Sequence, residues 1–175
     1  EVEVMSDGKN IGRSGKASQS TTSNNAGAER AIDGNKSHSF SSAGQTHTVE
    51  GKKDAWWEVD LGKMAKIDVI SVWNRNEGDL GKRLDGFTLS LLDAQKKEIF
   101  TSKSVTAPET AVIFNLKKGA DVVYAGADGK IAKTVSVPLG HRDPVPFKFE
   151  KGDTVAIIGN GLADRMQHDG WSETL

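Results

Sequence analysis

Apolar residues alternate with polar ones along several short stretches of this chain. Val2 and Val4, for example, alternate with Glu1 and Glu3. Successive side chains of a strand point to opposite faces, so this spacing predicts antiparallel strands with one buried face. Strands separated by Gly- and Pro-bearing turns predict an all-β fold, an antiparallel β-sandwich. The same alternation, or a short apolar run, recurs at residues 57–61, 67–73, 87–91, 112–116, 122–124, 130–137, 146–149 and 154–158.

Two parts of the chain lack this alternation. Residues 10–56 are mostly polar, and a loop-like region of that length in a compact domain is usually functional. Within it, residues 26–33 predict one short helical turn. After the strand at 154–158, residues 161–168 predict a helix. We therefore expect a sandwich domain at residues 1–120 and an extension at residues 121–175, which holds linker strands and a short strand-helix unit.

Positive and negative residues nearly balance, with 23 Lys and Arg against 24 Asp and Glu, and they form no basic stripe. We therefore expect no nucleic-acid partner. The chain has no cysteine, which excludes disulfides and a thiolate metal site. It has no apolar run of the roughly 20 residues that a membrane span needs, and no amino-terminal signal peptide. Because it begins at Glu1 without methionine, we expect a processed protein or a piece of a longer one.

Four motifs follow one another from the polar region onward. They read Ala-Ile-Asp-Gly-Asn at 31–35, Thr-His-Thr at 46–48, Ala-Trp-Trp-Glu-Val-Asp-Leu-Gly at 55–62 and Asn-Arg-Asn-Glu-Gly-Asp-Leu-Gly-Lys-Arg-Leu at 74–84. In this order, residues 15–92 resemble the fucolectin (F-type lectin) branch of the galactose-binding-like, discoidin-related (F5/8 type C-like) jelly rolls. The resemblance implies a calcium-assisted, non-catalytic module that binds fucose- or galactose-like glycans. It also implies a secreted, periplasmic or cell-surface location within a longer multidomain protein.

A sugar presents hydroxyl and ring oxygens together with one apolar face, so its site needs fixed hydrogen-bonding groups beside an apolar surface. In the resembled family a histidine and two arginines hold the sugar, and the matching residues are His47, Arg75 and Arg83. Phe40 is the best aromatic candidate for the apolar face of the sugar. The alternative for Phe40 is a core residue that anchors a loop.

The loop between the two arginines departs from the family pattern. Fucolectins typically carry two adjacent cysteines there, which pack on the sugar, whereas residues 76–81 contain none. Leu80 is the candidate for an apolar surface in their place. The acidic side chains of Glu77 and Asp79 argue against strict fucose selectivity.

Trp56 and Trp57 form an adjacent pair that suggests sugar stacking. Trp57, however, shares one face of its alternating run with Val59 and Leu61. We therefore expect Trp57 in the core of the sandwich.

The turn at residues 33–35 is a candidate calcium site. Its carboxylate and exposed carbonyls provide the hard oxygen ligands that calcium prefers, although Asp-Gly is also common in simple turns. In the resembled family a glutamate of the closing strand joins this site, and here a Glu-Val-Glu-Val strand stands first in the chain, as if permuted. An exposed amino-terminal strand with two carboxylates is the alternative for residues 1–4. The expected calcium ligands are the carbonyl of Arg30, with Asp33, Asn35, Gly44 or Gln45, and Glu1.

Residues 149–166 resemble, more weakly, the first block of GDSL-type (SGNH) hydrolases. In that block a nucleophilic serine follows Gly-Asp, whereas residues 159–161 read Gly-Asn-Gly without serine, and the chain stops at Leu175 before a downstream catalytic Asp and His pair could appear. We therefore expect no enzyme activity from this chain. Two alternatives to the lectin hypothesis remain: a structural or assembly domain without a sugar site, and a fragment of a hydrolase.

Overall fold

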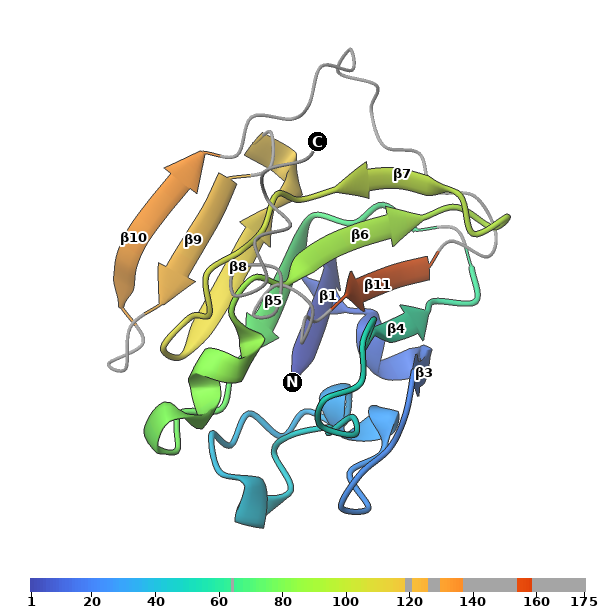
Figure 1. Ribbon diagram of the computed structural model, residues 1–175. Helices are drawn as coiled ribbons and strands as arrows, with labels where there is room; N and C mark the ends of the chain where they lie inside the picture. Colours follow the sequence, from blue (N-terminus) through green and yellow to red (C-terminus); the bar gives the residue numbers. More distant parts are fainter. Residues whose placement is uncertain (64, 119–120, 126–129, 137–153, 159–175) are drawn as a thin grey trace, which may run out of the picture.

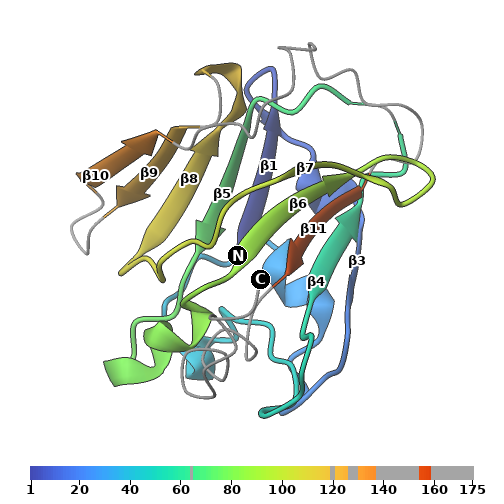
Figure 2. The ribbon, with the colours of Figure 1, turned by 45° about the horizontal axis from the view of Figure 1, so that its top comes forward.

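The computed structural model describes residues 1–63, 65–118, 121–125, 130–136 and 154–158, which form two antiparallel sheets. Figures 1 and 2 show the sheets as two layers packed face to face. Among the described residues, no helix is long and apolar enough to cross a membrane. The strands are β1 (Val2–Ser6), β2 (Lys9–Asn10), β3 (Lys16–Gln19), β4 (Trp57–Asp60), β5 (Val69–Trp73), β6 (Thr88–Leu92), β7 (Glu98–Thr101), β8 (Ala111–Asn115), β9 (Asp121–Ala125), β10 (Ile131–Ser136) and β11 (Thr154–Ile158). The 3-10 turns are η1 (Gly12–Ser14), η2 (Ala28–Ala31), η3 (Phe40–Ser42), η4 (Gly78–Leu84) and η5 (Leu116–Lys118).

One sheet has six strands in the order β10-β9-β8-β5-β1-β2. Strand β1 pairs antiparallel with β5, so that Val2 lies opposite Val72 and Val4 opposite Ile70. Val2 and Val4 are buried and Glu3 is half-buried, as the alternation predicts. The amino-terminal segment is therefore an inner strand of this sheet, and the alternative of an exposed amino-terminal strand is wrong because Glu1, Val2 and Val4 are buried.

The other sheet has five strands in the order β3-β4-β11-β6-β7. Strand β11 pairs with β4 on one side and with β6 on the other. Strands β9 and β10 likewise continue the six-stranded sheet. The described parts of the expected 121–175 extension thus pair with both sheets of the sandwich, and the expected 146–149 strand and 161–168 helix lie outside the described residues.

The core lies between the two sheets and confirms the predicted β-sandwich. Phe87 and Phe114 are fully buried, and their rings meet edge to face with centroids 6.3 Å apart. Trp57 is buried, as predicted, and its indole N–H donates to the carbonyl of Ala28 at 2.9 Å. Trp56, the next residue toward the amino end, is 37% exposed. Burial of the large side chains thus follows the alternation of the strands.

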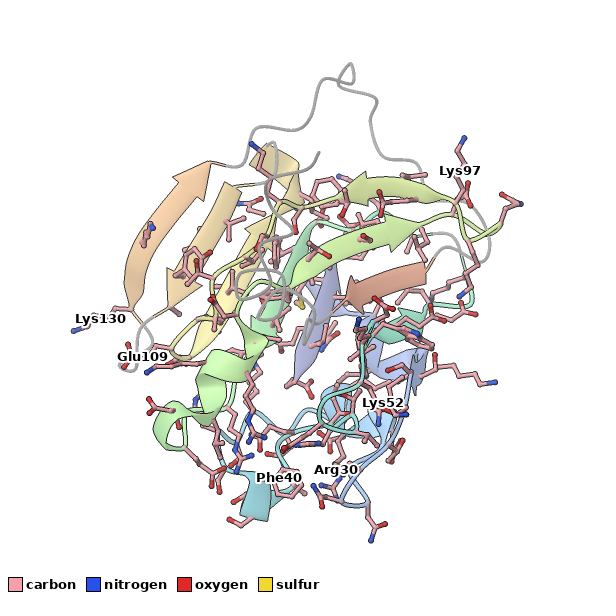
Figure 3. The ribbon with its side chains drawn as sticks, in the orientation of Figure 1. Arg30, Phe40, Lys52, Lys97, Glu109 and Lys130 are labelled. Carbon is pink, nitrogen blue, oxygen red and sulfur yellow. The ribbon has the colours of Figure 1, made fainter. Side chains whose placement is uncertain are left out.

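The long polar region forms loops at one end of the sandwich. Figure 3 shows Arg30, Phe40 and Lys52 together at this end, while Lys97, in the β6–β7 turn, lies at the opposite end. The segment between β5 and β6, which includes η4, reaches the same end as these loops (Figure 1). Two parts of the chain that are distant in sequence thus meet there, and we name them the first loop (residues 20–56) and the second loop (residues 74–86).

Candidate functional site

An open depression of about 810 Å³ lies between the first and second loops. Both loops line it, together with the first two residues of the chain. Of the residues predicted to bind sugar, the depression is lined by His47, Arg75, Leu80 and Arg83. The structure therefore gathers these four residues at one concave surface, and their roles in sugar binding stay predictions.

His47 is fixed by hydrogen bonds on its backbone and its ring. Its backbone N–H donates to the Ala26 carbonyl at 3.1 Å, and its own carbonyl accepts from Ser23 N–H at 2.9 Å. The ring Nδ1 lies 2.6 Å from the carbonyl oxygen of Thr48. Because a carbonyl oxygen can only accept, Nδ1 carries the proton, and Nε2 of the neutral ring is an acceptor. A neutral His47 ring would therefore accept a hydrogen bond from a sugar hydroxyl at Nε2.

Arg75 is held by Glu77, which also joins the two loops. Its Nε donates to the Glu77 carboxylate at 2.6 Å. The same carboxylate accepts from the hydroxyl of Ser39 and the backbone N–H of Phe40, each at 2.9 Å. These bonds, led by the Phe40 N–H, hold the pKa of Glu77 below its usual range. Beyond its predicted effect on fucose selectivity, Glu77 thus clamps the first loop to the second.

Buried Asn74 fixes the second loop from behind. Its side-chain carbonyl accepts from Arg75 N–H at 2.8 Å, and its amide donates to the carbonyls of Gly81 and Pro108 at 3.0 and 2.8 Å. Gly81 packs tightly, because a Cβ there would lie 2.3 Å from the Arg75 carbonyl oxygen. The backbone on both sides of Arg75 is therefore held in place.

Arg83 makes its contact with a carboxylate of the first loop. Its Nη1 donates to Glu50 Oε1 at 2.5 Å, and the same oxygen lies 3.8 Å from His47 Nε2. The Glu50 side chain is 65% exposed, whereas that of His47 is 16% exposed. Glu50 therefore bridges two of the predicted sugar-binding residues.

Phe40 lies against these residues and not along the depression itself. Its ring meets the His47 ring edge to face at 5.8 Å, and the Arg75 guanidinium lies 5.2 Å from its centroid. These contacts agree with the loop-anchoring alternative for Phe40. Leu80, in contrast, is half-buried in η4 and lines the depression, where it offers apolar surface.

The predicted calcium residues also approach one another. Gly34 N–H donates to Glu1 Oε2 at 3.1 Å, which joins the first strand to the Asp-Gly-Asn turn. The other Glu1 oxygen and the side-chain oxygen of Gln45 are buried without a hydrogen-bond partner, and both residues line the depression. Unpaired buried oxygens are rare, and carboxylate and amide oxygens are ligands that calcium prefers. Burial raises the pKa of the Glu1 carboxyl, against the effect of the Gly34 bond.

The other predicted ligands are engaged in local turns. Asp33 accepts from Asn35 N–H at 2.7 Å, and Asn35 donates to the Ser42 carbonyl at 2.7 Å. Gly44 has no room for a side chain, since a Cβ would lie 2.1 Å from the Ser37 carbonyl oxygen. The Arg30 side chain is placed at this end of the molecule in Figure 3. Within the described ranges no three His, Cys, Asp or Glu residues form a metal-binding group, so a calcium site here would depend on amide and carbonyl oxygens.

The sequence did not reveal the contribution of three residues of the site. These are Glu50, Glu77 in its clamping role, and buried Asn74. For the two acids, the available signal was proximity in the sequence: Glu77 follows Arg75 by two residues, and Glu50 follows His47 by three. Nothing in the sequence marked Asn74, because its amide donates to carbonyls that lie 7 and 34 residues further along the chain.

Comparison with known proteins agrees with this fold. Residues 30–125 match the family described as NedA-like, galactose-binding domain, of the F5/8 type C group. Fucolectin-1 of Anguilla japonica is 29% identical over an alignment of 137 residues, and the match covers 75% of this chain and 72% of that protein. These matches give no support to the expected GDSL-type block.

Two solved structures are similar over most of the chain. The lectin domain of lectinolysin, complexed with Lewis B antigen, is 26% identical with a TM-score of 0.58, covering 90% of this chain and 99% of that one. A Streptococcus pneumoniae fucose-binding module is 25% identical with a TM-score of 0.59, covering 89% and 99%. The matched family covers more than half of the 175 residues, and it includes both loops of the site from residue 30 onward. The chain therefore belongs to the F5/8 type C family of galactose-binding-like domains, with similarity to F-type lectins.

Proposed function

We propose that this chain is a calcium-assisted carbohydrate-binding module for fucose- or galactose-like glycans. The observation that carries the proposal is the convergence of His47, Arg75 and Arg83 on one open depression. The similar fucolectin, lectin domain and fucose-binding module support a binding function without catalysis.

Each of these side chains has a distinct part in holding the sugar. Arg75 and Arg83 donate to hydroxyl or ring oxygens, which are acceptors without charge. Because Nδ1 of His47 donates to the Thr48 carbonyl, Nε2 is the atom that faces the sugar, and in the neutral ring it accepts a hydroxyl hydrogen. Leu80 covers C–H groups of the sugar, and Phe40 supports His47 and Arg75 from behind. One pocket of this kind makes few contacts, so useful affinity depends on several copies acting together.

The test is replacement of each arginine, followed by binding to a glycan array and titration with L-fucose and D-galactose. A hydrogen bond to a charged group contributes roughly 1.5–3 kcal/mol, so Arg75→Ala and Arg83→Ala should each weaken binding by at least about ten-fold. Lys97→Ala is the matched control, because it removes a cation at the opposite end of the sandwich. Unchanged binding in both arginine variants would show that the assigned site is wrong.

Calcium is proposed to be held by Glu1 and Gln45, with Asp33, Asn35 and the carbonyls of Arg30 and Gly44 around them. Support comes from the unpaired, buried oxygens of Glu1 and Gln45. Bound calcium supplies a positive charge that ties the first strand to the first loop. The residues themselves set the position of the Thr-His-Thr segment, since Gln45 lies two residues before His47 and donates to the Ser37 carbonyl at 2.8 Å.

The metal is tested separately from the sugar, by thermal unfolding in calcium, magnesium or a chelator. Calcium should raise the unfolding midpoint, and magnesium should raise it less because it demands a stricter octahedron. Glu1→Gln should remove the calcium shift, while Glu3→Gln, whose carboxylate pairs with Lys36, should keep it. Absence of any shift with calcium would remove the metal from the proposal and leave the sugar site to its own test.

The location of the protein is also part of the proposal. A glycan-binding module serves a secreted, periplasmic or cell-surface protein, where it attaches further domains of a longer parent to a glycan-bearing surface. Detection of the full-length parent in the culture supernatant or on intact cells tests this, and a purely intracellular parent contradicts it.

A further inference from the structure

Three cationic side chains that line the depression each form an ion pair with a carboxylate. Arg75 pairs with Glu77 at 2.6 Å, Arg83 with Glu50 at 2.5 Å and Lys82 with Asp79 at 2.7 Å. Among the described lining residues, four are Lys or Arg (Lys52, Arg75, Lys82, Arg83) and four are Asp or Glu (Glu1, Glu50, Asp79, Asp85), so the formal charge is 4 − 4 = 0. The side chains of the depression thus offer many donors while their own formal charges balance.

Glu50 differs from the other two acids in its position. Glu77 is bonded to the backbone of the first loop, and Asp79 lies three residues before its partner on the same turn. Glu50 instead crosses from the first loop to the second and places one oxygen near both Arg83 and His47. A sugar oxygen that contacts both Arg83 and His47 would therefore have to share or displace this carboxylate oxygen.

We propose that Glu50 is a specificity-determining residue, an internal carboxylate that makes this site select neutral sugars over anionic ones. The inference rests on the proposed sugar-binding function and deepens it. A neutral hydroxyl can displace or share the exposed Glu50 oxygen, because the carboxylate has further acceptor positions and is free to move into water. A sulfate or carboxylate on the sugar would instead meet a like charge beside the arginine that it needs, which is unfavourable.

The experiment compares methyl α-L-fucoside with its monosulfate esters, titrated into the whole chain by calorimetry. The test variant is Glu50→Gln, which keeps the size of the side chain and removes its charge. The matched control is Asp54→Asn, which removes the same charge from the same exposed loop outside the lining of the depression. Far-ultraviolet circular dichroism checks that both variants keep the fold.

In the wild type the sulfate esters should bind more weakly than the neutral fucoside. Glu50→Gln should improve the affinity for the esters, relative to the neutral fucoside, by about three- to ten-fold at low salt, and Asp54→Asn should leave this ratio unchanged. At roughly 1 M NaCl, where charges are screened beyond about 3 Å, the difference between wild type and Glu50→Gln should shrink. A merely structural role for Glu50 would not show this salt dependence.

Two results would overturn the inference: an unchanged ratio in Glu50→Gln, or an equal change in Asp54→Asn, which would mean that only the overall charge matters. Failure of the proposed function looks different, since the wild type would then bind no neutral fucoside. The inference about Glu50 rests on that function and would then be contradicted together with it.

Discussion

The sandwich core and the two loops of the site keep their shapes through different interactions. In the core, large apolar side chains such as Phe87 and Phe114 are completely buried between the sheets. In the loops, most of the contacts that fix the backbone are polar, such as the Glu77 carboxylate with Ser39 and Phe40 and the Asn74 amide with Gly81 and Pro108. The core is stabilised by buried apolar side chains, whereas the loops are held by individual hydrogen bonds. The two regions should therefore respond to mutation in different ways.

The largest effect is expected in the core. Phe114→Ala removes a fully buried ring and should lower the free energy of unfolding by about 3–5 kcal/mol. Chemical denaturation measures this, with Val49→Ala, at a 36% exposed position, as the control that should change little. At temperatures where Phe114→Ala is still folded, its sugar affinity should equal that of the wild type, and a parallel loss of affinity would mean that the two regions are not independent.

Adjacent residues of the first loop should give effects of opposite sign. Gly44→Ala places a Cβ 2.1 Å from the Ser37 carbonyl oxygen, and we expect a loss of about 1–3 kcal/mol in the free energy of unfolding. Ala43 has a φ of 58°, a left-handed conformation that glycine adopts more easily. Ala43→Gly should therefore stabilise the protein by about 0.5–1 kcal/mol. Thermal and chemical unfolding of the two variants side by side checks the sign, and a loss in both would contradict the loop geometry.

Glu77→Gln should separate binding from stability. A neutral amide makes weaker bonds to Arg75 and to the Phe40 N–H than a carboxylate does, because charge-assisted bonds are roughly twice as strong. We expect sugar affinity to fall by about ten-fold, with only a small change in the unfolding midpoint. Glu98→Gln, an exposed acid of β7 outside both loops, serves as the control.

The ionisation of the Glu77 carboxylate predicts the pH below which sugar affinity declines. The pKa of Glu77 is lowered in the folded protein from an ordinary value of 4.5, so its bonds are fully formed above that pH. They are lost as the pH falls through the lowered pKa, and the clamp between the loops is lost with them. Sugar affinity should therefore hold from neutral pH to about 4.5 and decline below it. In Glu77→Gln this acid-dependent decline should be absent, and an unchanged profile would assign the titration to another group.

The smallest effect is expected at the Lys82–Asp79 pair, although it lies in the second loop. Both side chains are at least 80% exposed, and surface ion pairs of this kind contribute little. Asp79→Asn should leave the unfolding midpoint and the affinity for neutral sugar unchanged within error. A clear loss of either would extend the essential contacts of the second loop beyond Glu77 and Asn74.

The strands that alternate strongly could be predicted from the sequence, and others could not. The β4 and β6 strands carry the buried residues Trp57, Val59, Leu89 and Leu91 at a spacing of two. Strand β3, with the sequence Lys-Ala-Ser-Gln, is a polar edge strand without such a signal. The position of β11 between β4 and β6 is set by pairing in space across a long separation in the chain, which a local pattern cannot encode.

The site shows the same division. His47, Arg75 and Arg83 could be identified as candidate sugar-binding residues through the family resemblance, because they stand in recognisable motifs. Their carboxylate partners could not, since whether Glu50 reaches Arg83 depends on how two loops, 33 residues apart at this contact, pack together. The proton position on His47 depends likewise on the direction of the Thr48 carbonyl.

Residues 50–54 form a part of the binding surface that protein engineering could vary. All five are exposed, and the backbone turns there through left-handed conformations at Gly51 and Asp54. Insertions and replacements are tolerated best in exposed loop tips of this kind. A combinatorial library that varies the length and charge of this short segment would therefore alter what approaches Arg83 and leave both sheets intact. It offers directed evolution one compact target from which new glycan preferences can be selected.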